Sequence, residues 1–173
     1  MKSPILAADM HLTLRTLIVV FFTLAGWQNA CAENYARVLG VVASLDEYKD
    51  SYAVGVGVGR DLPRLAPHLG VEGEFFKSFS KMDGKTGDLT FNKTAVFATY
   101  SYPIETRVHL HGKVGLRYAA FKDSVAGDSS NVGVDWGIGT LLVLDHNRNL
   151  VVEFITSDEN KFSQLAIGLQ FFY

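Results

Sequence analysis

The feature of this sequence that most constrains its fold is a regular alternation of large apolar residues with small or polar ones. In the segment 162–173, the large apolar side chains stand at every second position: Leu165, Ile167, Leu169, Phe171 and Tyr173. The positions between them hold Gln164, Ala166, Gly168 and Gln170, with Phe172 as the exception. Side chains of a β-strand point alternately to its two faces, so this pattern predicts strands with one apolar face.

Turn-forming clusters divide residues 33–173 into eight expected strands. The stretches 83–88 (DGKTGD) and 126–131 (AGDSSN) are rich in residues that tolerate positive φ or bond to their own backbone. All four prolines lie outside the strand centres, as expected for a residue that cannot donate to a strand ladder. The expected strands are 35–45, 51–60, 68–80, 89–102, 108–122, 132–144, 150–157 and 162–173. The pattern of the first strand (YARVLGVVASL) does not assign its two faces.

The first 32 residues differ from the rest and are typical of a cleavable signal peptide. Lys2 and Arg15 supply positive charge, and the apolar run 17–26 follows them. Ala30 and Ala32 form an A-x-A cleavage pattern. The run is too short to span a bilayer, which needs about 20 residues. We therefore expect export, with residues 1–32 as signal peptide and 33–173 as one mature domain.

Other interpretations of this leader remain open. It could be a buried core helix or a short membrane anchor, or a lipoprotein signal that ends at Cys31, although Gln28 stands where such signals usually carry a leucine-like residue. Met10 is an alternative start. Cys31 is the only cysteine, so the mature domain cannot rely on disulfides. The formal net charge of −2 and the absence of a basic patch with interleaved aromatics give no reason to expect nucleic acid as a partner.

Alternation alone does not say whether the apolar face points inward or outward. Here the less apolar face is dominated by glycine and alanine with interspersed charges, which suits the narrow lumen of a small barrel better than a solvent-facing surface. Aromatic residues near strand ends on the apolar face are typical of membrane interfaces: Tyr100, Tyr102, Phe171 and Tyr173. Each unpaired backbone group costs several kcal/mol in hydrocarbon, so a membrane sheet must close. We therefore predict an all-β, eight-stranded, antiparallel, up-and-down transmembrane β-barrel.

Four segments carry a resemblance to a known family. They are 54–59 (VGVGVG), 71–75 (VEGEF), 112–118 (GKVGLRY) and 166–173 (AIGLQFFY). Together with the eight-strand pattern, they resemble the OmpA-like family of small outer-membrane β-barrels over essentially all of the mature chain. The resemblance implies a bacterial outer-membrane location and contact with outer-membrane lipid. The even number of strands puts both termini on one side of the membrane, which is the periplasmic side in bacteria. The resemblance also implies that Leu169, Phe171 and Tyr173 form the signal read by the barrel-assembly machinery. We expect short surface loops and no peptidoglycan-binding domain after the barrel.

Keeping the lipid face apolar sends a set of charged and histidine side chains into the lumen. They are Glu72, Glu74, His109, His111, Lys113, Arg117, Asp135 and Glu153. Charges inside a narrow barrel must pair or stay hydrated, because unpaired burial is expensive. An eight-stranded barrel is just wide enough to be filled by side chains. We therefore expect an ion-pair network that fills the lumen. A small gated pore whose resistance depends on those pairs is the functional alternative.

Two kinds of site chemistry are alternatives to this network. His109 and His111 stand two apart on one strand and could bind a metal with Glu72 or Glu153, but we expect neither a metal nor a cofactor. A lipid-modifying barrel enzyme would need a serine, a histidine and a carboxylate. The candidates, none in a recognisable motif, are Ser101, Ser124 and Ser157 with His109, His111 or His146.

We expect an integral outer-membrane barrel without enzymatic activity, in a structural, interaction or minor porin-like role. The alternatives are such a lipid-modifying enzyme and an exported soluble barrel that binds a small apolar ligand.

Overall fold

The computed structural model describes residues 33–45, 48–84, 87–125, 127–157 and 162–173. The expected signal peptide, including Ala30 and Ala32, lies outside these residues. Within the described part of the chain, no helix is long and apolar enough to cross a membrane.

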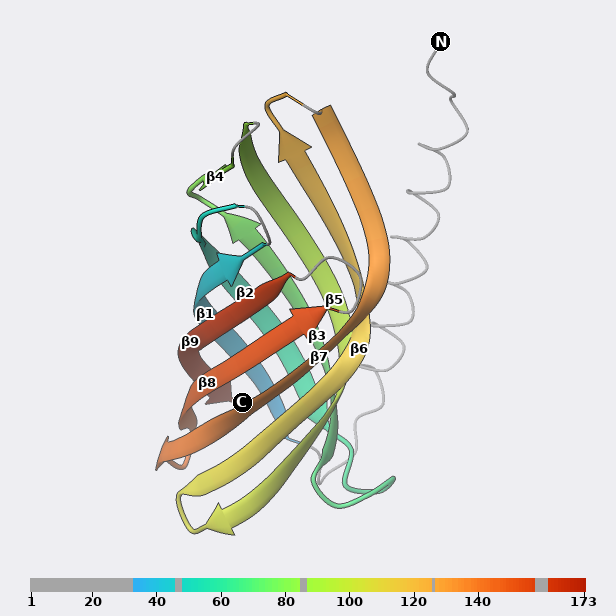
Figure 1. Cartoon of the computed structure of the whole chain (residues 1–173). Helices are drawn as coiled ribbons and strands as arrows, with labels where there is room; N and C mark the ends of the chain where they lie inside the picture. Colours follow the sequence, from blue (N-terminus) through green and yellow to red (C-terminus); the bar gives the residue numbers. More distant parts are fainter. Residues whose placement is uncertain (1–32, 46–47, 85–86, 126, 158–161) are drawn as a thin grey trace. The chain divides into compact units, whose positions relative to one another are not determined.

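Nine strands follow one another along the described chain (Figure 1). They are β1 (Asn34–Ser44), β2 (Ser51–Asp61), β3 (Leu69–Ser78), β4 (Met82–Asp83), β5 (Asp88–Glu105), β6 (Val108–Asp123), β7 (Gly127–Asp145), β8 (Arg148–Ser157) and β9 (Ser163–Phe172). Eight of them are long and match the eight expected strands, while β4 is a two-residue strand within the β3–β5 connection. The alternation of the sequence therefore located every main strand.

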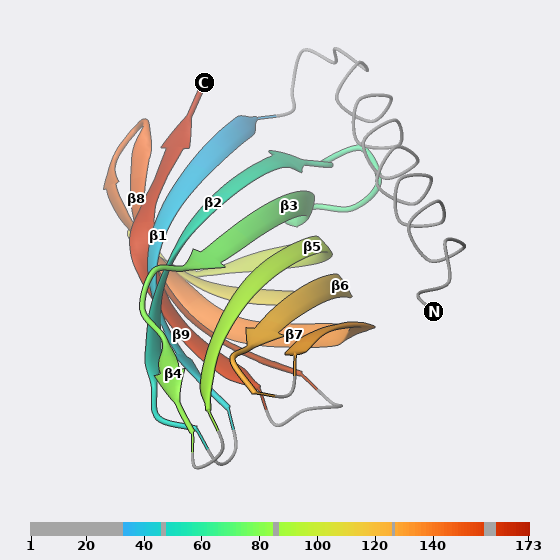
Figure 2. The same cartoon turned by 90° about the horizontal axis from the view of Figure 1, so that it is seen from above.

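The eight long strands close into one antiparallel barrel. Each strand pairs with its neighbours in the chain, and β1 also pairs with β9. The ring is completed by pairing of β3 with β5, in which Gly73 faces Val96. Figure 2 looks down on the curved sheet and shows these strands following one another around it. The expected up-and-down, eight-stranded barrel is confirmed.

The two faces of the sheet differ as the sequence predicted. The outward-pointing side chains are exposed, for example Val38 at 57%, Val56 at 54% and Ile167 at 55%. The alternate positions on the same strands point inward, and most of them are buried in the barrel. Small residues inside leave room for larger neighbours: a Cβ at Gly59 would lie 2.2 Å from the ring of Tyr35. The apolar face is therefore the outer face. This arrangement contradicts the soluble barrel with an apolar interior, because such a carrier would turn its valines inward.

The two ends of the barrel are built differently. The end that carries Asn34 and Phe172, called here the terminal end, has tight turns at 105–108 and 145–148. In the second turn, Arg148 Nε donates to Asp145 Oδ2 at 2.8 Å. This bond, with the one from the Asn147 N–H, holds the pKa of the half-buried Asp145 carboxyl below its usual value.

The opposite, distal end is extended by β6 and β7. β7 begins at Gly127, five residues earlier than predicted, because residues 127–131 continue the ladder with β6. Pairing of β7 with β8 starts only at Asp135 and Ser157. Among the described residues, the segment 127–134 therefore pairs on one side only, and the β6–β7 hairpin projects beyond β8 (Figure 1).

Candidate functional site in the barrel lumen

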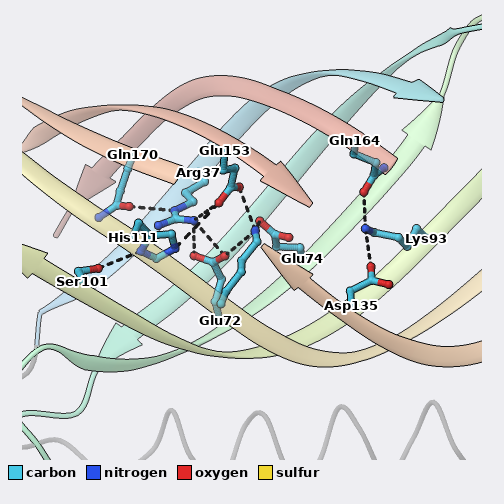
Figure 3. A network of polar contacts seen from close by, with 11 residues as sticks. Arg37, Glu72, Glu74, Lys93, Ser101, His111, Asp135, Glu153, Gln164 and Gln170 are labelled. Carbon is cyan, nitrogen blue, oxygen red and sulfur yellow. Dashed lines mark hydrogen bonds and ion pairs between the residues drawn. The ribbon is translucent and has the colours of Figure 1, made fainter. Parts of the chain in front are cut away.

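Buried charged side chains gather inside the barrel in two clusters (Figure 3). The terminal-end cluster consists of Arg37, Glu72, Glu74, His111, Lys113 and Glu153. The distal-end cluster consists of Lys93, Arg117 and Asp135, with the polar side chains of Ser157 and Gln164. All of these residues are at most 6% exposed, so the clusters occupy the interior rather than line an open channel.

The terminal-end cluster is organised around two cations. Arg37 Nη1 lies 2.7 Å from Glu72 Oε2 and 3.7 Å from Glu153 Oε2. Lys113 Nζ donates to Glu74 Oε1 and to Glu153 Oε1, both at 2.9 Å, and lies 3.5 Å from Glu72 Oε1. Glu72 and Glu153 are therefore each shared between the two cations. The residues come from β1, β3, β6 and β8, so the contacts tie opposite walls of the barrel together.

The distal-end cluster is organised around one carboxylate. Asp135 Oδ2 lies 2.8 Å from Lys93 Nζ, and its Oδ1 lies 2.7 Å from Arg117 Nε. The hydroxyl of Ser157 also donates to Asp135. Gln164 accepts a further hydrogen bond from Lys93, and the Lys93 amine stands 4.9 Å from the centre of the Phe76 ring. One carboxylate therefore serves two cations.

The charges of the two clusters complement each other. Two cations face three carboxylates at the terminal end, with His111 beside them, whereas two cations face one carboxylate at the distal end. Four positive and four negative side chains thus share one lumen. Because buried charges are tolerated only when paired, this balance lets both clusters lie inside the barrel.

An apolar layer covers the distal-end cluster on its outer side. The ring of Phe162 packs edge-on against Phe91 and Phe121, with centroids 5.1 and 6.0 Å away. Met82 and Leu89 are buried in the same group. We call these five residues the distal cap. Three aromatic rings at this end add large side chains to a lumen whose middle is already filled by ion pairs.

The structure places most of the sequence-predicted lumen residues within the two clusters. Five of them meet at the terminal end: Glu72, Glu74, His111, Lys113 and Glu153. Arg117 and Asp135 meet at the distal end. His109 stands on the inward face of β6 but is half-buried near the terminal end. No ion pair or hydrogen bond of its side chain within the described part of the chain connects it to either cluster.

Two central cations, Arg37 and Lys93, were missed by the sequence reasoning. Arg37 lies on the first strand, whose faces the pattern left unassigned. The rule that charges avoid the lipid face would have sent it inward and Val38 outward. Lys93 lies on β5, where both faces carry polar residues, so alternation gives little guidance there.

The serine candidates for catalysis have separate environments. Ser101 Oγ lies 2.9 Å from His111 Nδ1, and His111 Nε2 lies 3.9 Å from Glu153 Oε2. Ser157 belongs to the distal-end cluster, and Ser124 accepts a hydrogen bond from the Asp88 N–H in a turn. Of these three serines, only Ser101 therefore lies beside a histidine that in turn lies near a carboxylate. Across the residues described, no group of three or more potential ligands is arranged to hold a metal ion.

An apolar outer wall, a charged interior and a closed antiparallel sheet define a transmembrane β-barrel of the bacterial outer membrane. The chain belongs to the family of the outer membrane protein beta-barrel domain, whose model matches residues 17–173. Bacterial barrels of this type place their short turns in the periplasm, so we expect the terminal end to be periplasmic and the distal end to be extracellular.

Solved structures of other outer-membrane proteins share the fold. The barrel resembles the N-terminal β-barrel domain of Pseudomonas aeruginosa OprF, with 11% identity, a TM-score of 0.62, and coverage of 82% of this chain and 99% of that one. Neisserial surface protein A is 14% identical with a TM-score of 0.59, and the match covers 81% of this chain and 96% of that one. Ail, the attachment invasion locus protein of Yersinia pestis, is 16% identical with a TM-score of 0.56, and the match covers 82% of this chain and 97% of that one. No curated protein matches the chain.

Proposed function

We propose that this protein is a structural outer-membrane barrel whose lumen is normally closed by its ion pairs and which has only a minor, gated permeability. The observation that carries the proposal is the filling of the lumen by the two buried clusters and the distal cap. An eight-stranded barrel has just enough interior space for side chains, so ions can pass only where these side chains move aside.

The shared carboxylates suggest how such a path could open. Glu153 Oε1 accepts a hydrogen bond from Lys113 Nζ at 2.9 Å, and Arg37 Nη1 lies 3.7 Å from the other carboxylate oxygen, Oε2. If Lys113 swings away from Glu153, Arg37 can take over the carboxylate, so the barrel need not leave that charge unpaired. Lys113 is therefore the proposed gating residue, and Arg37 is its substitute partner.

Single-channel recording in planar lipid bilayers tests this proposal. We expect the wild-type protein to give only rare, brief openings and Lys113→Ala to give frequent openings. Lys49→Ala is the matched control, because the Lys49 side chain is 80% exposed outside the lumen. Each variant must first show the gel shift on boiling that marks a folded barrel. A steadily open wild-type channel, or equal conductance of the two variants, would overturn the proposal.

The interaction part of the role is assigned to the projecting β6–β7 hairpin. Asp128, Ser129 and Ser130, at the start of β7, are exposed and polar, so they can contact partners beyond the membrane surface. An epitope inserted between Asp128 and Ser129 should bind antibody on intact cells. Binding that requires permeabilised cells would reverse the proposed orientation.

A second candidate function follows from Ser101, His111 and Glu153. In an acyl hydrolase, the serine oxygen attacks an ester carbonyl while the histidine takes its proton and passes it to the leaving alcohol. The 2.9 Å contact between Ser101 Oγ and His111 Nδ1 supports this second function, whereas Glu153 Oε2 lies 3.9 Å from His111 Nε2, too far for a hydrogen bond that would orient the imidazole. Labelling by a fluorophosphonate probe that is lost in Ser101→Ala but kept in Ser124→Ala would support the enzyme. Absence of labelling in the wild type would exclude a reactive serine.

A further inference from the structure

A lysine interrupts the apolar outer wall of the barrel near its extracellular end. Lys77 on β3 has the same outward direction as Phe75, and its side chain is exposed. Its partner on β2 is Val54, another outward-facing residue, and its partner on β5 is Asn92. A cation on the lipid-facing wall is costly unless it reaches the interface or a counter-ion.

The outer wall beside Lys77 is polar along β5, whereas it is apolar along β2 and β9. On β5, every second residue toward the extracellular end is an outward hydrogen-bonding residue: Thr94, Asn92 and Thr90. At the corresponding outward positions, β2 presents Tyr52, Val54 and Val56, and β9 presents Leu165, Ile167 and Leu169. Polar residues are thus concentrated on one side of the wall.

Aromatic side chains place this polar surface at the membrane boundary. Phe79, two residues beyond Lys77, stacks with Tyr52 at a centroid distance of 6.5 Å, and both rings are exposed. Tyr118 on β6 is opposite Thr94. Tyrosine and other aromatic residues gather where hydrocarbon meets headgroups. Lys77 and Asn92 therefore stand at the level of the outer leaflet's headgroups.

A second lysine lies on the far side of β5. Lys122 on β6 is opposite Thr90 and exposed. Lys77 and Lys122 are two strands and two residues apart, a Cα separation of roughly 12 Å from standard sheet spacings. Flexible lysine side chains at that separation can converge on one anionic group or contact two groups of one headgroup.

Carboxylates of the protein neutralise the lysines of this outer surface only in part. Asp128 on β7 is opposite Lys122, whereas Asp88 pairs with Lys81 at 2.8 Å. No ion pair involving Lys77 occurs among the described residues. An exposed cation at the interface, flanked by hydrogen-bonding groups, is complementary to a phosphate.

We propose that Lys77, Asn92, Thr94 and Lys122 form a binding site for the phosphate-bearing headgroup of an anionic outer-leaflet lipid. The ammonium groups supply charge, while the amide and hydroxyl groups donate hydrogen bonds to phosphate oxygens. A bound headgroup would also fix the rotation of the barrel in the membrane, since the site lies on one wall. This site depends on the membrane placement of the barrel and is independent of the gating role of Lys113.

Native mass spectrometry of the folded full-length barrel tests the site. The protein is equilibrated in mixed micelles that hold equal amounts of phosphatidylglycerol and phosphatidylcholine, and the lipids that stay bound are counted. We expect the wild type to retain phosphatidylglycerol at least threefold over phosphatidylcholine. Lys77→Gln should lose this preference, Lys77→Arg should keep it, and the exposed-loop control Lys49→Gln should match the wild type.

Two outcomes would overturn the proposal. The first is a wild type without preference for the anionic lipid, or a preference that Lys77→Gln and Lys49→Gln reduce equally. The second is complete displacement of phosphatidylglycerol by millimolar inorganic phosphate, which would indicate a site for free phosphate rather than a lipid headgroup. Persistence of the lipid in phosphate, together with its loss in Lys77→Gln, identifies a lipid site.

Discussion

Asp135 and Lys93 form a buried ion pair in which the carboxylate oxygen lies 2.8 Å from the side-chain amine. The two residues belong to β7 and β5, so the pair reaches across the intervening β6. Asp135 also holds Arg117 at 2.7 Å, and no other carboxylate pairs with either cation among the described residues. The stability of this half of the lumen therefore depends on a single negative charge.

Asp135→Asn should strongly destabilise the barrel. The asparagine keeps the shape of the side chain but leaves Lys93 and Arg117 buried without a counter-charge. Removing one partner of a buried pair costs about 3–5 kcal/mol. Urea unfolding of the protein in lipid vesicles gives the free energy of unfolding directly. Asp145→Asn is the control, because Asp145 lies in an exposed turn, and a loss no greater than that of the control would refute the single-anchor interpretation.

Gly168→Ala and Gly40→Ala should differ sharply, although the two glycines lie on paired strands. An added Cβ at Gly168 would lie 1.9 Å from the Val38 carbonyl oxygen, a backbone atom that cannot rotate away. At Gly40 the nearest atom is 3.8 Å distant. We expect Gly168→Ala to lose about 1–3 kcal/mol or more and Gly40→Ala to be neutral or slightly stabilising. Equal unfolding midpoints in urea would contradict the observed packing at β1 and β9.

Phe162→Ala should weaken the distal cap. Phe162 is almost fully buried and is the ring that contacts both Phe91 and Phe121. Truncating a buried phenylalanine costs about 3–5 kcal/mol. Phe162→Leu keeps most of the volume and should cost less. If the alanine variant unfolds at the same urea concentration as the wild type, the contacts of Phe162 contribute little.

The fold could be predicted almost completely because its main determinant is local. Alternation and turn residues located all eight long strands, because the two faces of each strand differ in the residues of that strand itself. The start of β7 was the main error: the glycine and polar residues at 127–131 are typical of a turn. They form a strand because their partners on β6 hold them in register, which is information from outside the segment.

The site could be predicted in composition but only partly in connectivity. The alternation of faces along a strand predicts that Glu72 and Asp135 point inward. It does not predict which cation each carboxylate pairs with. That depends on how far neighbouring strands are shifted around the barrel. Arg37 was missed because both faces of its strand are largely apolar, so alternation alone does not assign them; the charge of Arg37 itself is the signal that would have pointed it inward.

Leu169→Arg tests whether the apolar outer wall meets lipid. Leu169 points outward from β9 and is 36% exposed in the isolated barrel, whereas Val125, in the turn between β6 and β7, is 73% exposed. In water, arginine would be tolerated at either position. In a bilayer, arginine on the lipid-facing wall costs about 2–4 kcal/mol near the middle and little at the ends. We therefore expect Leu169→Arg to lower the free energy of unfolding in lipid vesicles by this amount, while Val125→Arg leaves it unchanged. Equal effects of the two variants would mean that the wall around Leu169 does not face hydrocarbon.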